Sequence, residues 1–231
     1  MSYSDGWAAL NLEMPPRVPR TEYSVAGHWE LIRAVTGIPV TADSPAEVRE
    51  RAQKAFVGHR GWNYDMNWSI LISAGEFGDL RTDMGHAVYD AGGGDFRTTV
   101  HCPFTTPEEV LAFDPVAAYG QKDRAVLVKR FEDHYRANRA CFPDLVSMTG
   151  IYTTVISGLI DIFGWEMLLL AAGTDLAGFG KVADRYARWI QQYFDALAAA
   201  DVPVVMVHDD IVWTSGPFLP PDWYRAHVFP H

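Results

Sequence analysis

The stretch Val202-Pro203-Val204-Val205-Met206-Val207-His208-Asp209-Asp210 decides the expected fold class of this chain. Its first six residues are apolar and mostly β-branched, which is typical of a buried β-strand. Three ionisable residues, His208, Asp209 and Asp210, follow at the carboxyl end of that strand. In folds built on parallel strands, ligands and reactive groups gather at this end of the sheet. The stretch therefore predicts an α/β protein with a site where the strand ends.

Strand-like and helix-like stretches alternate along the rest of the chain. Short apolar runs predict two further strands, at residues 68–72 and 145–148. Longer patterned stretches predict helices at residues 22–35, 121–141, 153–172, 179–197 and 221–228. Apolar strands separated by long amphipathic helices indicate a parallel sheet covered by helices. Both a doubly wound sheet and a (β/α)8 barrel have this alternation.

Two tetrapeptides have the residues that start a helix. Ser44-Pro45-Ala46-Glu47 offers a serine N-cap, a proline at the first helical position and a glutamate that closes a capping box. Thr106-Pro107-Glu108-Glu109 repeats the pattern. We therefore expect Ser44 and Thr106 to cap the helices that follow them.

The composition is that of a folded protein and argues against two classes of partner. Hydrophobic residues make up 48% of the 231 residues and charged residues 21%, which supplies a core and excludes intrinsic disorder. The 19 basic and 29 acidic residues give a net charge of −10, and the basic residues form no run. Nucleic acids and anionic membranes attract the opposite charge, so we expect neither as a partner.

Compartment signals favour a cytoplasmic protein. The N-terminus has neither the basic nor the apolar region of a secretory signal. The most apolar stretch, residues 155–173, contains Asp161 and Glu166 and so predicts a buried helix rather than a membrane span. Acids in such a helix are usually paired or reach the surface. Cys102 and Cys141 have no metal-ligand spacing, and we expect both to be reduced.

Polar residues also follow the two other predicted strands. The strand at 68–72 leads into a loop at 79–86 whose charged residues are Asp79, Arg81, Asp83 and His86. Tyr152, Thr153 and Thr154 follow the strand at 145–148. Because parallel strands end at the same edge of a sheet, these residues can line one pocket. The alternatives are a solvated loop, a helix cap made by Thr153, and a turn capped by one of the two strand-end acids.

Several segments of the chain resemble a known family. Residues 204–210, then Gly216-Pro217, then Pro221-Asp222-Trp223-Tyr224-Arg225 and Pro230, resemble the central segment of the uroporphyrinogen decarboxylase superfamily. Residues 150–154 are similar to that family's glycine-led strand exit, and residues 17–23 to its R-x-P segment. The resemblance implies a TIM-type (β/α)8 barrel and an enzyme of tetrapyrrole decarboxylation or of corrinoid-dependent methyl transfer.

Two departures rank the reactions that the resemblance implies. Decarboxylases of the family have an arginine-rich loop that binds substrate carboxylates, whereas this chain has only Arg17 and Arg20 there. They also have a tyrosine after the strand exit, where this chain has Ser157-Gly158. We therefore expect methyl transfer between a small methylated substrate and a corrinoid first, and decarboxylation of uroporphyrinogen in porphyrin biosynthesis second. A non-catalytic fragment or binding module is the third alternative.

The length predicts an incomplete barrel, since a full one needs roughly 250 residues. We expect residues 1–59 to form an N-terminal helical extension and residues 60–231 the N-terminal half to two-thirds of the barrel. Zinc ligands implied by the resemblance would then lie beyond His231. An unclosed barrel leaves a free edge at the strand 202–207 or 68–72, which predicts self-association.

The predicted site combines these features. The catalytic residues are expected to be Asp209, Asp210 and His208. The substrate-binding residues are expected to be Tyr152, Thr153, Arg81, Asp83, His86 and Trp213. The expected partners are a small molecule, or a tetrapyrrole or corrinoid, with a corrinoid protein as a further partner. No metal ligand is predicted within the chain itself.

Overall fold

A computed structural model describes residues 1–22, 25, 27–84, 100–209, 211–212 and 216–231 of the chain. The chain divides into two compact units. Unit 1 comprises Met1–Ser69, Arg130–Gly150 and Asp201–Met206. Unit 2 comprises Ile70–Lys129, Ile151–Ala200 and Val207–His231.

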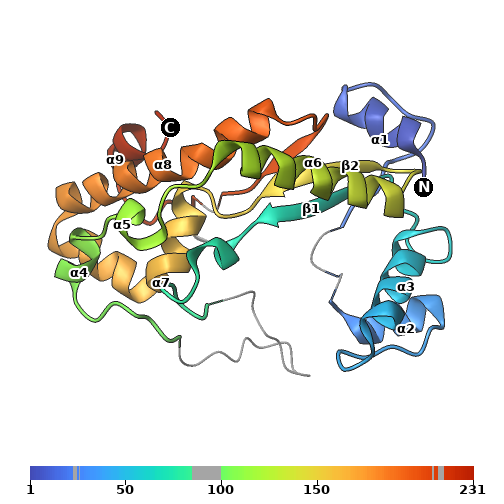
Figure 1. Cartoon of the computed structure of the whole chain (residues 1–231), viewed down its shortest axis with the longest axis horizontal. Helices are drawn as coiled ribbons and strands as arrows, with labels where there is room; N and C mark the ends of the chain where they lie inside the picture. Colours follow the sequence, from blue (N-terminus) through green and yellow to red (C-terminus); the bar gives the residue numbers. More distant parts are fainter. Residues whose placement is uncertain (23–24, 26, 85–99, 210, 213–215) are drawn as a thin grey trace. The chain divides into compact units, whose positions relative to one another are not determined.

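Three strands form one parallel sheet (Figure 1). They are β1 (Met66–Ile72), β2 (Val146–Ile151) and β3 (Val205–Val207), in the order β1-β2-β3. The amide of Val146 donates to the carbonyl of Asp65 at 2.9 Å, and the amide of Tyr152 donates to the carbonyl of Ile72 at 2.9 Å. The first bond joins the start of β1 to the start of β2, and the second joins their ends. The two strands therefore run in the same direction.

The prediction of an incomplete TIM-type barrel is wrong. Within the described residues the sheet has three strands, where a partial barrel of this kind needs at least four. The strand predicted at 202–207 shortens to β3, and its Val205 and Val207 side chains are 49% and 48% exposed. Pro203 has no amide hydrogen for the ladder, and β3 has its sheet neighbour on one side only. An apolar, β-branched run predicts a strand, but it does not predict how many other strands join it.

β1 and β3 are the outer strands of the sheet, because β2 lies between them. A free edge was expected at one of these two strands. The outer strand of a sheet is where amides and carbonyls are open to pairing with another chain. Self-association of the protein remains a prediction.

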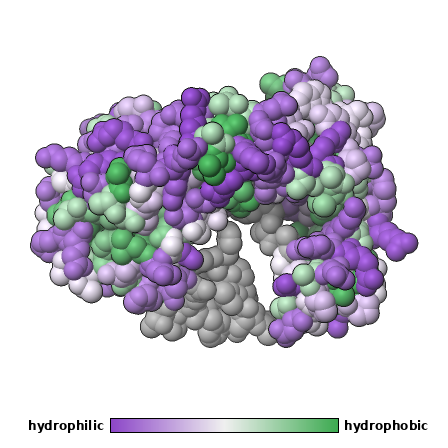
Figure 2. All heavy atoms as spheres, viewed as in Figure 1, coloured by the Kyte–Doolittle hydropathy of each residue, from purple (hydrophilic) through white to green (hydrophobic). Residues whose placement is uncertain are grey.

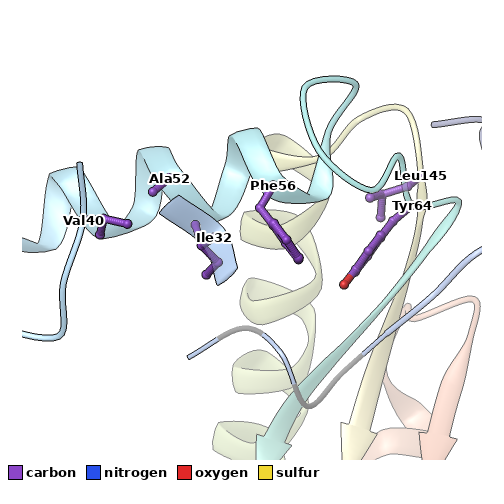
Figure 3. Packing of buried hydrophobic residues seen from close by; sticks show 6 residues of the cluster. All are labelled: Ile32, Val40, Ala52, Phe56, Tyr64 and Leu145. Carbon is purple, nitrogen blue, oxygen red and sulfur yellow. The ribbon is translucent and has the colours of Figure 1, made fainter. Parts of the chain in front are cut away.

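Unit 1 is a helical cluster with its own core. It contains α1 (Tyr3–Leu10), α2 (Trp29–Thr36), α3 (Ala46–Val57) and most of α6 (Arg124–Cys141). Helices α2 and α3 pack against each other through buried apolar side chains. The core residues, shown in Figure 3, are Ile32, Val40, Ala52, Phe56, Tyr64 and Leu145.

A buried carboxylate holds the N-terminal segment of unit 1 in place. Asp65 is fully buried and accepts hydrogen bonds from the amides of Ser2, at 2.8 Å, and Arg20, at 3.0 Å. Its third partner is the guanidinium of Arg17, which also contacts Asp5 at 3.3 Å. The two arginines near the N-terminus are thus tied into unit 1. The sequence alone did not single out Asp65.

Unit 2 is built around two long helices. They are α7 (Val155–Thr174) and α8 (Leu176–Ala199), accompanied by the 3-10 helix η1 (Ala74–Phe77), α4 (Pro107–Leu111), α5 (Pro115–Tyr119) and α9 (Pro221–His227). Helix α7 packs against α4 and α8, and α8 packs against α9. The predicted apolar stripe of α8 is confirmed, since all of its members are buried: Val182, Tyr186, Trp189, Tyr193 and Leu197.

Helix α7 contains a kink at Gly164, whose φ of 69° and ψ of 167° are not helical. This left-handed conformation is open to glycine but strained for other residues. In the described ranges α7 is the helix that is long and apolar enough to cross a membrane, and most of its apolar stretch is buried in the protein. The expectation that this stretch forms a buried helix is therefore confirmed.

One of the two predicted helix starts is confirmed and the other is wrong. Thr106 caps α4 in a complete capping box with Glu109. Ser44 does not cap α3, because the N-cap position falls on Pro45, which has no side chain to accept a bond. The Ser44 hydroxyl instead accepts a hydrogen bond from the amide of Thr41 at 2.9 Å. A nearby turn therefore competes successfully for the serine side chain.

On the face shown in Figure 2, the described residues are mainly hydrophilic, with smaller hydrophobic patches between the polar side chains. This matches a chain with 48 charged residues among 231, of which 29 are acidic. The exposed hydrophobic side chains include Val205 and Val207 of β3 and Phe229 after α9.

Candidate functional site

The candidate site lies in unit 2, where β2 and β3 end. Tyr152 follows β2 and His208 follows β3, and their rings stack with centroids 4.5 Å apart and planes 4° apart. The amide of Tyr152 donates to Ile72, and the amide of His208 donates to Ile151 at 3.4 Å. Strand pairing thus brings together two rings that are distant in sequence. Both side chains remain partly exposed.

Asp209 caps helix α7 from a distant part of the chain. Its carboxylate accepts hydrogen bonds from the amides of Ser157, at 2.7 Å, and Ile156, at 3.2 Å. These are amides of the first turn of α7, which have no acceptor within the helix. A negative charge at a helix N-terminus is also favoured by the helix dipole. Asp209 therefore caps α7 and not the turn after β3 that was the alternative for the strand-end acids, while its catalytic role remains a prediction.

The threonines after β2 also connect the two strand ends. The N-cap residue of α7 is Thr154, whose side chain makes no cap bond and instead donates to the carbonyl of His208. Thr153 is fully buried, and its carbonyl accepts a hydrogen bond from the Tyr186 hydroxyl at 3.3 Å. Its own hydroxyl has no hydrogen-bond partner among the described residues. The expectation that Thr153 caps the helix is wrong, because Asp209 supplies the cap.

The loop after β1 docks on helix α7 rather than on the strand ends. The Thr82 hydroxyl donates to the carbonyl of Asp161 at 2.7 Å, and the Thr82 amide donates to the same oxygen at 3.0 Å. Burial raises the pKa of the Asp161 carboxyl to about 6, against the opposing effect of the Arg81 charge. The charge of Arg81 thus favours the ionised form of Asp161, while burial disfavours it. Exposed Asp83 accepts a hydrogen bond from the amide of His101 at 2.7 Å.

The structure therefore brings some predicted site residues together and separates others into a second group. Tyr152, His208 and Asp209 meet at the strand ends. Arg81 lies with Asp161, and Asp83 with His101. Asp210, His86 and Trp213 lie outside the described residues.

Tyr186, whose hydroxyl donates to the carbonyl of Thr153, was missed as a site residue. Burial raises the pKa of its hydroxyl well above the usual value, and the charges of Asp161 and Asp209 both add to this effect. A Cβ at Gly158 would overlap the Tyr186 hydroxyl. The sequence signal was Gly158 itself, because a glycine inside an apolar helix often marks a close approach by another group.

A small apolar pocket follows Asp209 along the chain. It has a volume of about 190 Å³, and its walls are Ile211, Val212, Pro217, Pro221, Tyr224, Arg225 and Phe229. Burial raises the pKa of the Tyr224 hydroxyl, and the charge of Asp209 raises it further. The backbone amides of Leu219 and Phe218 lower this pKa and so oppose the effect. The pocket's first lining residue, Ile211, lies two positions after Asp209 in the chain. Its volume is below the roughly 300–1,000 Å³ of pockets for drug-sized ligands.

Metal ligands do not gather in the described part of the chain. No three His, Cys, Asp or Glu side chains there come close enough to hold a metal ion. Both cysteines are free, as expected. The Cys102 thiol donates to the carbonyl of Phe163 at 3.2 Å, and burial raises its pKa.

The candidate site thus lies where two neighbouring strands end, within unit 2. No protein family matches the chain, and no curated protein or solved structure matches it. The resemblance to the uroporphyrinogen decarboxylase superfamily therefore rests on the residues quoted for it.

Proposed function

We propose that unit 2 contains the substrate site of a small-molecule enzyme of the uroporphyrinogen decarboxylase type. Its proposed reaction is transfer of a methyl group from a small methylated compound to a corrinoid. The observation that carries this proposal is the stacked pair of Tyr152 and His208 at two neighbouring strand ends. A small apolar pocket begins at Ile211, three positions after His208 in the chain. The sequence resemblance contributes the class of reaction.

The pocket suits a compact, weakly polar substrate. Its volume of about 190 Å³ leaves little room for an extended molecule, and its walls are apolar except for Arg225, which pairs with Asp222. Tyr224 is a further lining residue, and its hydroxyl oxygen is buried. A small molecule with a methylated oxygen, sulfur or nitrogen combines an apolar body with one acceptor atom.

His208 is the proposed proton donor. When a methyl group leaves as a cation, its bonding electron pair stays on the heteroatom that held it. A proton delivered to that heteroatom completes the leaving group, and histidine is the most common donor. The stack on Tyr152 and the hydrogen bond from Thr154 to the His208 carbonyl orient this residue. Asp209 acts through position, since it joins the same strand end to α7.

Tetrapyrrole decarboxylation fits less well. The pockets of about 190 and 240 Å³ among the described residues of unit 2 are each smaller than the roughly 300–1,000 Å³ of pockets for drug-sized ligands. Arg17, one of the two arginines that this chain has in place of the family's arginine-rich loop, is engaged with Asp65 and Asp5 in unit 1. The residues given a role in the proposed reaction are therefore not ligands of the corrinoid or of a metal.

A non-catalytic binding module is the second candidate function. The cap that Asp209 makes on α7 favours it, because a carboxylate committed to two amides serves the fold. Such a module would bind the small molecule in the same pocket without converting it.

The test mixes the purified protein with cob(I)alamin and one small methyl donor, either methanol, methoxybenzene or trimethylamine. Formation of methylcobalamin is followed by its absorption spectrum. The expected result is turnover with at least one donor, and a loss of about a hundredfold in His208→Gln, the usual scale for a general acid. The matched control is His101→Gln, an exposed histidine of unit 2 that should leave the rate unchanged.

Three other outcomes decide between the candidates. Binding of a donor without methylcobalamin supports the binding module. Equal rates in His208→Gln and the unchanged protein contradict the role of His208. Turnover of uroporphyrinogen, and of none of the three methyl donors, would replace methyl transfer with decarboxylation.

A further inference from the structure

A second pocket of unit 2 lies beside helix α8 and the start of α5. Its volume is about 240 Å³, and two arginines of α8, Arg185 and Arg188, line it. None of its lining residues belongs to the strand-end site. A ligand of this pocket would therefore bind apart from the strand-end site.

Arg185 is held in a fixed orientation. Its Nε donates to the carbonyl of Phe113 at 3.0 Å. Its Nη2 donates to the carbonyls of Leu111, at 2.9 Å, and Phe113, at 2.8 Å. Its Nη1 makes no hydrogen bond within the described part of the chain. A guanidinium that other groups already orient loses less conformational freedom when it binds an anion.

Arg188 lies one turn further along α8, on the same side of the helix as Arg185. It is exposed, and no hydrogen bond or ion pair engages it among the described residues. Two guanidinium groups therefore line one pocket, and the more exposed one is open to a ligand. Arginine pairs favourably with carboxylate and phosphate because its planar fork matches two oxygens at once.

The acidic charge at the pocket is already engaged. Asp114 is the acid that lines it. Its Oδ1 accepts from the amides of Val116, at 2.8 Å, and Ala117, at 3.4 Å, and so caps α5. Two arginines against one carboxylate leave the wall with a positive balance, on a chain whose net charge is −10. A positive pocket on an acidic protein concentrates anions locally.

The remaining walls are Gln121 and three apolar residues. Pro115 is buried, Val116 is part of the same wall, and Trp189 is 2% exposed. The Trp189 indole donates to the carbonyl of Gly120 at 2.7 Å, which fixes the ring. A ligand for this pocket therefore needs an oxyanion for the arginines and a compact apolar body for the wall.

We propose that this pocket binds a small organic anion, a carboxylate or phosphate group on a compact apolar body, with Arg188 and Arg185 as its charged ligands. The apolar body lies against Trp189 and Pro115. This site goes beyond the proposed function, and it does not require the strand-end site to be active.

The test is calorimetric titration of the full chain with three probes that share one ring. Benzoate and phenyl phosphate carry the two oxyanions, and benzamide is the neutral counterpart of benzoate. The expected result is binding of at least one anion, at least tenfold tighter than benzamide and weakened by added salt. The stronger of the two anions identifies the charged group that the pocket prefers.

The decisive variant is Arg188→Gln, because Arg185→Gln would also break the contacts with Phe113 and Leu111. Arg188→Gln should weaken anion binding by about tenfold or more, the scale of a lost hydrogen bond to a charged group. Arg188→Lys should lose less, because it keeps the charge but not the fork. The matched control is Lys181→Gln, which removes one positive charge from an exposed position of α8 outside the pocket.

Three results would overturn the proposal. The first is equal affinity for benzoate and benzamide. The second is an equal loss of affinity in Arg188→Gln and Lys181→Gln, which would reduce the effect to overall charge. The third is no binding of either anion at about 10 mM, since a weaker interaction is not a specific site.

Discussion

The Asp209 carboxylate accepts a 2.7 Å hydrogen bond from the backbone amide of Ser157, 52 residues earlier in the chain. A second bond, from the amide of Ile156, completes the cap on α7. The residue after β3 thus closes the N-terminus of the helix that follows β2. This one side chain connects the candidate site to the core of unit 2.

Replacing Asp209 should reveal this structural role. Asp209→Ala should lower the free energy of unfolding by about 1–2 kcal/mol, because two first-turn amides lose their acceptor. Asp209→Asn should cost less, because the amide oxygen still accepts a hydrogen bond. Urea denaturation of both variants measures the difference. Asp222→Ala, at a side chain that is 95% exposed, is the control and should change stability by less than about 0.5 kcal/mol.

Asp161 should make stability depend on pH in a predictable direction. Its pKa is about 6 in the folded protein and about 3.9 in an unfolded chain. The folded state therefore binds the proton more tightly, so this contribution to stability is complete below pH ~4 and lost as pH rises through 6. Asp161→Asn removes the titration. Its stability relative to the unchanged protein should rise by about 1–3 kcal/mol between pH 4 and pH 7.

Thermal or urea unfolding at pH 4, 5, 6 and 7 measures the Asp161 effect. Glu166→Gln, an exposed position on the same helix, is the control and should show no such trend. A constant difference between Asp161→Asn and the unchanged protein across this range would contradict the prediction.

Two glycines of α7 should respond in opposite ways to the same substitution. In Gly158→Ala the new methyl group would overlap the Tyr186 hydroxyl and lie 2.5 Å from its Cζ. Overpacking of this kind should cost about 1–3 kcal/mol. In Gly173→Ala the methyl group meets nothing within 4 Å. That variant should be neutral or more stable by up to about 1 kcal/mol, because alanine favours the helix. Equal melting temperatures for the two variants would show that Tyr186 does not lie against α7.

Asp65 and Asp5 both contact Arg17 and should differ sharply in importance. Asp65→Ala leaves the amides of Ser2 and Arg20 without their acceptor in a buried place, and should cost about 2–4 kcal/mol. Asp5→Ala removes a longer contact to an arginine that is 40% exposed, and should cost about 1 kcal/mol or less. Urea denaturation of the two variants compares them directly. A smaller loss for Asp65→Ala than for Asp5→Ala would contradict this account.

Local signals in the sequence predicted most of the helices. The apolar stripe of α8 repeats at helical spacing, and its residues are buried. Thr106 and Glu109 form the predicted capping box because the whole motif lies within four residues. The prediction that Ser44 caps a helix was wrong, because its hydroxyl accepts a hydrogen bond from the amide of nearby Thr41 instead. Where two local motifs compete, the pattern of either one is insufficient.

The sequence could not predict the number of strands. The apolar run at 202–207 predicts a strand, and β3 forms within it. The barrel expectation also needed further strands to pair, and pairing joins segments that are far apart along the chain. Such contacts leave no periodic signal in either segment. The β-branched side chains that a buried strand needs are also the ones that this outer strand exposes.

By itself, the sequence determined that helices and strands alternate, which faces of the helices are apolar, and the polar cluster after residue 207. Each of these depends on composition or on neighbours within a turn or two. Only the tertiary structure decided that Asp209 caps α7, that Tyr152 stacks on His208, and that Arg185 and Arg188 share a pocket with Asp114. The cap and the stack join residues more than 50 positions apart, and the pocket joins residues about 70 apart. Chain folding creates such contacts through long-range packing, which no local pattern of side chains encodes.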